Sequence, residues 1–184
     1  KEGCFLADYR AVEQLCKNAP AAIKELNDWG VQFAKDANGK LLQRFFGAHT
    51  YRRTCFVGDH TGRAIEAVLV EQTKKRNIQF LEEVYITSLM KHNGYVNGAV
   101  GFDMNTDETT LFNSKAVVLA TGGYSRVYRR STSRALENTG DGAALAFEAG
   151  AHLQDMEMMQ FHPTGMVWPE QAEGCPSRRR VYPA

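Results

Sequence analysis

The stretch Val117-Val118-Leu119-Ala120-Thr121-Gly122-Gly123 decides the fold of this chain. Its first half is rich in β-branched and apolar residues, which favour a buried strand. Its end is a turn in which glycine allows left-handed backbone angles and a close approach of the main chain to a ligand. A lone turn of this kind is more often a plain strand-to-loop connection. We refer to residues 117–123 as the first glycine-rich run.

A second glycine-rich run, Thr139-Gly140-Asp141-Gly142, follows shortly after and precedes an alanine-rich helix predicted over residues 143–149 and ended by Gly150. The Asp141 carboxylate can either cap this helix or accept a hydrogen bond from a ligand hydroxyl, and capping is the commoner role. The presence of this second run close to the first favours a ligand site over a plain turn. Together with the histidine segment described next, they are typical of a flavin site.

The histidine segment is Gln160-Phe161-His162-Pro163-Thr164-Gly165, in which a proline stiffens the backbone directly after the imidazole. A histidine held in this way can donate to a carboxylate substrate or take part in proton transfer. The plainer alternative is a buried histidine that is hydrogen-bonded to backbone. The spacing of the residues alone favours that alternative.

The remaining pattern predicts an α/β core. Apolar residues at helical spacing from Asp8 onward predict two consecutive helices, with Asn18 capping the second, Pro20 in its first turn and Gly30 at its end. Residues 31–33 predict a short strand, and residues 36–39 a hairpin turn. Thr61 or Asp59 is expected to cap a further helix. Alternating segments at 79–89, 95–104 and 109–113 predict an antiparallel meander, inserted before a buried strand over 116–120.

Composition excludes several classes of protein. The 184 residues are 43% hydrophobic with a formal net charge of +1, which argues against disorder and against nucleic-acid binding. No apolar run approaches the ~20 residues of a membrane span. Neither the cysteines nor the histidines have metal-ligand spacing, so no metal site and no disulfide framework are expected. Phosphate-binding loops and serine-hydrolase motifs are absent from the sequence as well.

Five motifs, in order, resemble the flavoprotein subunit of succinate dehydrogenase and fumarate reductase. They lie at residues 43–47, 53–62, 120–128, 139–142 and 160–165. The resemblance covers about residues 1–175, and Gly165 favours this family over the related L-aspartate oxidase. L-aspartate oxidase or another soluble fumarate-reductase-like flavoenzyme remains open as a second enzymatic alternative. An alternative from a different class is a non-catalytic α/β interaction module.

The resemblance implies that FAD is bound by a Rossmann-like doubly wound domain carrying the inserted meander, with residues 1–160 as a partial FAD-binding domain. Residues 161–175 would begin a capping domain that holds a dicarboxylate, succinate or fumarate, against the flavin. Hydride would pass between substrate carbon and flavin N5. His162 and Phe46 would contact the substrate. The implied cofactor contacts are Ala120, Thr121, Gly122, Gly123, Asp141, Glu83, Val84, Tyr85 and, more weakly, Thr61.

The resemblance also implies membrane-anchor subunits and an iron-sulfur partner subunit, which would place the protein in the cytoplasm, peripheral on the inner face of the membrane. The family's amino-terminal pyrophosphate motif, its flavin-linking histidine and its catalytic arginine have no counterpart here, so we expect an excerpt, truncated at both ends, without catalytic residues of its own. Residues 176–184 diverge from the family, and we interpret this tail as a reading-frame slip. An isolated excerpt is expected to retain flavin weakly.

Overall fold

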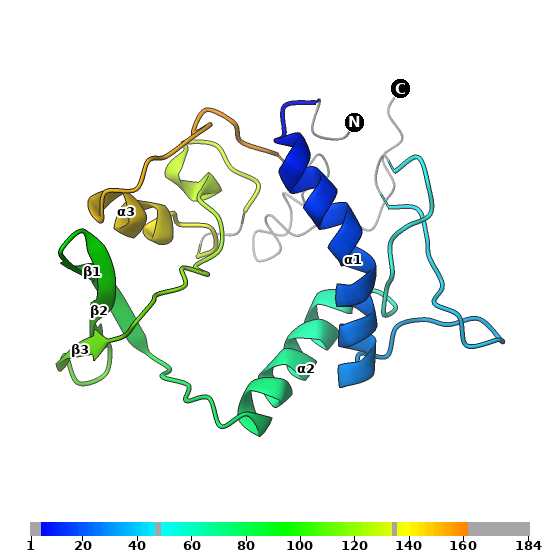
Figure 1. Cartoon of the computed structure of the whole chain (residues 1–184), viewed down its shortest axis with the longest axis horizontal. Coiled ribbons are helices and arrows are strands. Elements are labelled where there is room, and N and C mark those ends of the chain that lie inside the picture. The colour runs from blue at the N-terminus through cyan, green and yellow to red at the C-terminus, as the bar shows by residue number, and fades with distance from the viewer. Residues whose placement is uncertain (1–4, 47–48, 134–135, 162–184) are drawn as a thin grey trace. The chain divides into compact units, whose positions relative to one another are not determined.

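The computed structural model describes residues 5–46, 49–133 and 136–161. The chain divides into two compact units, Lys1–Phe80 and Leu81–Ala184. The first unit carries two helices and the second a small sheet with two short helical segments (Figure 1). In order, the elements are α1 (Tyr9–Trp29), α2 (Thr61–Lys75), β1 (Val84–His92), β2 (Tyr95–Asp103), β3 (Thr109–Asn113), the 3₁₀ helix η1 (Ser125–Val127) and α3 (Asp141–Glu148).

Helix α1 is a single helix of 21 residues with Pro20 in its interior, so the prediction of two helices with an Asn18 cap was wrong. Proline removes one backbone donor and crowds the preceding turn, at a cost of about 3 kcal/mol in a helix interior. The apolar spacing, however, runs through Pro20 without a change of phase. Helix α1 packs against α2 within the first unit (Figure 1), and this packing favours continuation over a break. Gly30, at φ 119°, ends the helix as predicted.

Asp8 caps the start of α1, because its carboxylate accepts hydrogen bonds from the backbone N–H groups of Arg10 (2.7 Å) and Ala11 (3.3 Å). We expect Asp8→Ala to lower the unfolding free energy of the protein by about 1 kcal/mol, since two amide donors lose their acceptor. Urea denaturation followed by far-ultraviolet circular dichroism measures this change. Asp8→Asn is the matched control, since the amide oxygen keeps the cap; equal destabilisation by both substitutions would contradict the capping role.

Residues 31–42 form a folded connection rather than the short strand predicted at 31–33. Val31 and Phe33 are almost fully buried, at 1% and 4% exposure. The next residue, Ala34, donates its N–H to the carbonyl of Phe56 (2.9 Å), which is distant in sequence, and accepts from the Leu42 N–H (2.8 Å). The predicted turn at residues 36–39 is present: the Asp36 carboxylate accepts from two backbone N–H groups, and an isolated bridge pairs Lys35 with Leu41.

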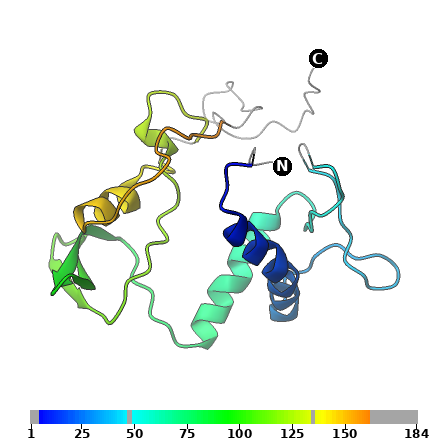
Figure 2. The same cartoon turned by 45° about the horizontal axis from the view of Figure 1, so that its top comes forward.

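The antiparallel meander is confirmed, with strand order β1-β2-β3. Its first strand begins later than predicted, at Val84. Gly98 and Gly101 in β2 lie where a side chain has no room: a Cβ on Gly98 would sit 2.1 Å from the Phe112 carbonyl oxygen, and one on Gly101 would sit 2.7 Å from that of Tyr85. The close approach of the three strands therefore depends on these two glycines. Helix α3 lies beside the sheet and contacts β1 (Figure 2).

The buried strand predicted over 116–120 is absent from the described part of the chain. These residues form neither helix nor strand, and Val118 is 88% exposed. A parallel strand obtains its hydrogen bonds only from strands beside it, and the described residues hold a sheet of three antiparallel strands instead. Four hydrophobic side chains are buried among the described residues: Val31, Phe33, Ala99 and Leu145.

Candidate functional site

The two glycine-rich runs meet directly in the second unit. Gly142, the second residue of α3, faces Thr121, and a Cβ placed on it would lie 1.9 Å from Thr121 Oγ1. The Gly140 N–H donates to the Gly123 carbonyl (3.2 Å). The runs at 117–123 and 139–142 thus form one surface built mainly of backbone.

Asp141 opens α3 but does not cap it, so the capping interpretation was wrong. The N-cap residue is Gly140, at φ 88°, and no side chain makes a capping hydrogen bond there. The Asp141 carboxylate instead accepts from the Thr139 hydroxyl (2.7 Å) and is exposed. An exposed carboxylate in the first turn of a helix interacts favourably with the helix dipole and keeps lone pairs available for a ligand hydroxyl.

Sequence reasoning missed Asn138, which ties the first glycine-rich run to its surroundings. Its side-chain oxygen accepts from the Gly123 N–H (2.8 Å), and its side-chain nitrogen donates to Ser133 Oγ (2.8 Å). Its carbonyl accepts from the Arg126 N–H (3.0 Å). Asn138 has a left-handed backbone at φ 57°, which asparagine tolerates better than most residues. The only sequence signal that could have pointed to Asn138 is its position directly before the Thr139-Gly140 pair.

Two tyrosines hold the segment that leads to the histidine motif. Tyr124 donates its hydroxyl hydrogen bond to the Met158 carbonyl (2.9 Å), and Tyr128 donates to that of Met156. The tyrosines flank η1, which directly follows the first glycine-rich run. His162 itself lies outside the described residues, so its predicted role stays a prediction. The backbone at 156–158 is nonetheless fixed to the segment that continues this run.

Val84 and Tyr85 begin β1, and Glu83 directly precedes it. Glu83 has φ 57°, and its carbonyl accepts from the Met104 N–H (2.8 Å). Val84 pairs with Asp103 in the ladder. The Tyr85 ring, 44% exposed, packs on Phe102 with 5.7 Å between ring centroids. The sheet therefore fixes the backbone of these three predicted contacts.

Phe46 belongs to the first unit, on a loop closed by paired hydrogen bonds between Arg44 and Thr54. Its ring is 61% exposed and meets the His49 ring edge-on, with centroids 6.5 Å apart. The Arg44 guanidinium stacks over Phe56 at 4.3 Å and steadies the base of the loop. The loop thus presents an aromatic face outward, as a substrate or cofactor contact requires.

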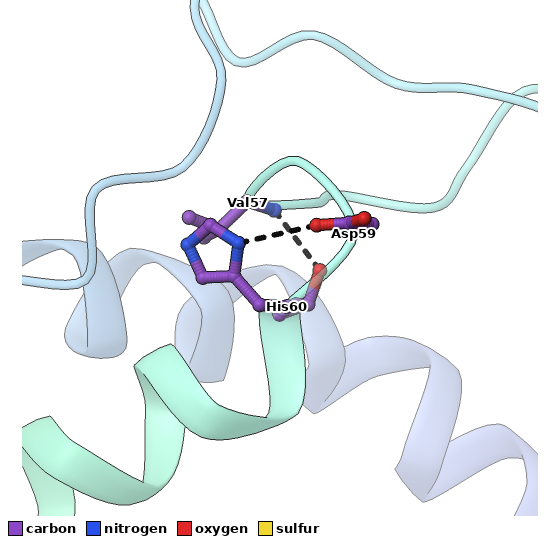
Figure 3. Close-up of polar contacts among 4 residues, drawn as sticks. Val57, Asp59 and His60 are labelled. Atoms are coloured by element: carbon purple, nitrogen blue, oxygen red, sulfur yellow. Dashed lines mark hydrogen bonds and ion pairs between the residues drawn. The ribbon is translucent and has the colours of Figure 1, made fainter. Parts of the chain in front are cut away.

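Thr61 begins α2 and does not cap it; the N-cap residue is His60, which makes no side-chain cap bond. Instead, Thr61 Oγ1 accepts from the Val57 N–H (3.0 Å) and closes the turn before the helix. In the same turn His60 Nδ1 lies 3.4 Å from Asp59 Oδ1 (Figure 3). The Thr61 hydroxyl proton remains able to donate to another group.

In the described ranges, no group of three or more histidine, cysteine, aspartate or glutamate residues could hold a metal ion. A hydrogen bond between Lys24 and Asp28 on α1 raises the pKa of the lysine and lowers the pKa of the aspartate. Both side chains are exposed. In the described part of the chain no helix is long and apolar enough to cross a membrane.

The two glycine-rich runs together offer exposed backbone and one carboxylate. Residues 120–123 are exposed, and Gly122 is at φ 79° with no Cβ to hold a ligand away from the main chain. Asp141 adds a carboxylate at the edge of the same surface. These are the elements that a strand-turn and a following helix offer to a dinucleotide.

Comparison with known proteins identifies the family. A family model described as "FAD binding domain" matches residues 1–181, and the chain therefore belongs to the FAD-binding domain family, whose cofactor is FAD. Over 172 residues the chain is 43% identical to a protein of the fumarate reductase (CoM/CoB) of Methanothermobacter marburgensis, covering 94% of this chain and 31% of that protein. Over 179 residues it is 44% identical to the succinate dehydrogenase flavoprotein subunit of Rickettsia bellii, covering 93% and 29%.

A solved structure agrees with these relatives. The Mycobacterium smegmatis Sdh1 complex in the apo form superposes with a TM-score of 0.81 at 39% identity, covering 94% of this chain and 31% of that one. The predicted class, an FAD-binding flavoprotein fold with an inserted antiparallel meander, is thereby confirmed. The chain spans about 30% of the length of the relatives it matches, with 31% and 29% of the two curated proteins covered.

Proposed function

We propose that this chain supplies the FAD-binding part of an oxidoreductase that interconverts succinate and fumarate. The contact between the two glycine-rich runs carries the proposal, because it creates an exposed backbone surface with Asp141 at its edge. Relatives named for succinate dehydrogenase and fumarate reductase support it. When bound, FAD supplies hydride transfer at its N5 atom. The comparisons give no support to L-aspartate oxidase or to a non-catalytic module.

Each predicted contact then has a role. Ala120, Thr121, Gly122 and Gly123 approach the cofactor with backbone, and Asp141 accepts from a cofactor hydroxyl. Glu83, Val84 and Tyr85 contribute main-chain groups, and the Thr61 hydroxyl can donate. Phe46 packs beside the reacting ring, and His162 donates to a substrate carboxylate. These assignments extend the organisation proposed for the sequence: a partial FAD-binding domain over 1–160, the start of a capping domain over 161–175 and a divergent tail over 176–184.

Partner subunits complete the proposal. The relatives are named as subunits, and one solved relative is described as quinol-fumarate reductase with menaquinol molecules. We propose that electrons leave the flavin through an iron-sulfur subunit. Membrane-anchor subunits would hold the assembly at the inner face of the cytoplasmic membrane.

FAD titration and substrate reduction test the proposal in the complete gene product that contains these residues. We expect saturable quenching of flavin fluorescence, followed by bleaching of the bound flavin on anaerobic addition of succinate. His162→Ala is expected to weaken succinate binding by about 10- to 150-fold, since a charge-assisted hydrogen bond is worth about 1.5–3 kcal/mol. FAD affinity should stay unchanged in this variant.

Each measurement has an outcome that would contradict the proposal. No saturable FAD binding would contradict the cofactor site. Binding of FAD without bleaching by succinate would contradict the substrate, and an unchanged succinate affinity in His162→Ala would remove His162 from the site.

A further inference from the structure

Asn138 occupies the centre of the hydrogen bonds around the first glycine-rich run. It is half-buried, it accepts from the Gly123 N–H, and it donates to Ser133 Oγ, both at 2.8 Å. Glycine is the most permissive residue for backbone conformation, so the pair Gly122-Gly123 holds one shape only if another group restrains it. The Asn138 side chain is such a restraint, since it binds the second of the two glycines directly.

Beyond Asn138, the hydrogen bonds continue through the hydroxyl groups of three serines. Ser133 Oγ lies 2.6 Å from Ser125 Oγ, and the Ser131 hydroxyl donates to Ser125 Oγ (3.2 Å). Ser125 is the first residue of η1, which follows the first glycine-rich run. Asn138 therefore connects the end of the first glycine-rich run to a hydrogen-bonded network that restrains the position of this run.

The fit around Gly123 is tight. A Cβ on Gly123 would lie 2.8 Å from the Asn138 side-chain oxygen, so the amide and the glycine backbone are in direct contact. Asn138 also stands immediately before the second glycine-rich run, and Gly140 bonds back to Gly123. The Asn138 side chain and the Gly140 backbone thus both bind Gly123 and help to fix how the two runs face each other.

We propose that Asn138 is a positioning residue that holds the backbone of residues 120–123 in the conformation that binds FAD. The inference rests on the proposed function, because it assigns the same surface to the cofactor. Asn138 acts through Gly123, whose N–H it occupies, and not by touching the cofactor. Its left-handed backbone, at φ 57°, makes glycine the substitution that removes the side chain without straining the main chain.

Asn138→Gly in the complete gene product tests the proposal, with FAD affinity from flavin fluorescence quenching as the first measurement. We expect the FAD dissociation constant to rise about 5- to 50-fold, because two hydrogen bonds that order the binding surface are lost. Asn138→Asp keeps an acceptor for the Gly123 N–H, and the Ser133 hydroxyl can rotate to donate to it. This variant should stay within about 3-fold of the wild type.

Asn93→Gly is the matched control. Asn93 is also an asparagine with a left-handed backbone in the second unit, at φ 51° in the turn between β1 and β2. Its replacement should leave FAD affinity unchanged. If Asn138→Gly does not fold, Ser133→Ala decides the question, since it removes the hydroxyl that orients the Asn138 amide, together with the contact of that hydroxyl with Ser125 Oγ. A several-fold loss of FAD affinity is then expected, and an unchanged affinity contradicts the proposal.

Hydrogen exchange in the protein without added FAD separates this inference from the proposed function. Asn138→Gly should accelerate exchange of the Gly123 amide, because that amide loses its acceptor. Wild-type affinity for FAD in Asn138→Gly would overturn the proposal, as would an equal loss in Asn93→Gly. A wild-type protein that binds no FAD would refute the proposed function and the positioning role together, while faster Gly123 exchange in the variant would still establish the hydrogen bond itself.

Discussion

Replacing Gly142 with alanine is expected to lower the unfolding free energy by about 2–3 kcal/mol, a typical cost of forcing extra volume into a packed site. The added Cβ would lie 1.9 Å from Thr121 Oγ1 and 3.0 Å from Thr121 Cβ. The Thr121 side chain, its backbone or α3 must shift to relieve such a contact. We therefore expect FAD binding to be lost as well, measured by fluorescence titration beside urea denaturation.

Gly62→Ala is the matched control for this prediction. Gly62 is the second residue of α2, as Gly142 is of α3, but a Cβ there meets nothing within 4 Å. Alanine at this position should stabilise the protein by about 0.4–1 kcal/mol, through the lower entropy of the unfolded chain. Adding Thr121→Gly to Gly142→Ala removes the clashing atoms and should recover part of the stability. Wild-type stability of Gly142→Ala alone would show that Thr121 does not pack on α3.

Gly98→Ala is expected to separate β3 from β2, since the added Cβ would lie 2.1 Å from the Phe112 carbonyl oxygen. Backbone cannot move aside as a flexible side chain can, so we expect a loss of about 2–3 kcal/mol in unfolding free energy. Hydrogen exchange of the β2–β3 amides should accelerate more than that of the β1–β2 amides.

Gly101→Ala is the counterpart on the same strand. Its Cβ would meet the Tyr85 carbonyl oxygen at 2.7 Å, on the β1 side, so the faster exchange should appear between β1 and β2. The two variants thus predict opposite patterns from one strand. The same pattern in both would contradict the close approach described for β2.

Local sequence predicted those elements whose hydrogen bonds are made within a short stretch. The meander needed only alternation and two turns, and α3 needed an apolar segment between glycines. Gly30 and the turn at 36–39 were predicted for the same reason. The residues that make α3, the end of α1 at Gly30 and the turn at 36–39 lie a few positions apart, and the strands of the meander follow one another directly through short turns.

Elements that depend on distant partners were not predicted. The break at Pro20 was predicted from a local rule, but packing between α1 and α2 outweighs that rule. The role of Asn138 depends on Gly123, 15 residues away, and no periodicity reveals such a pair. Residue type predicts Thr61 or Asp59 as one helix cap and favours capping over ligand contact for Asp141. In the structure Thr61 binds the Val57 amide and Asp141 a neighbouring hydroxyl.

Residues 116–120, which join no sheet in the structure, favour aggregation of the isolated chain. A run of β-branched and apolar residues outside any sheet is a template for strand addition by another molecule. With Val118 88% exposed, the 184-residue chain in isolation offers such an edge to its own copies. Aggregation of the isolated 184-residue chain would therefore report this exposed apolar segment and not a defective cofactor site.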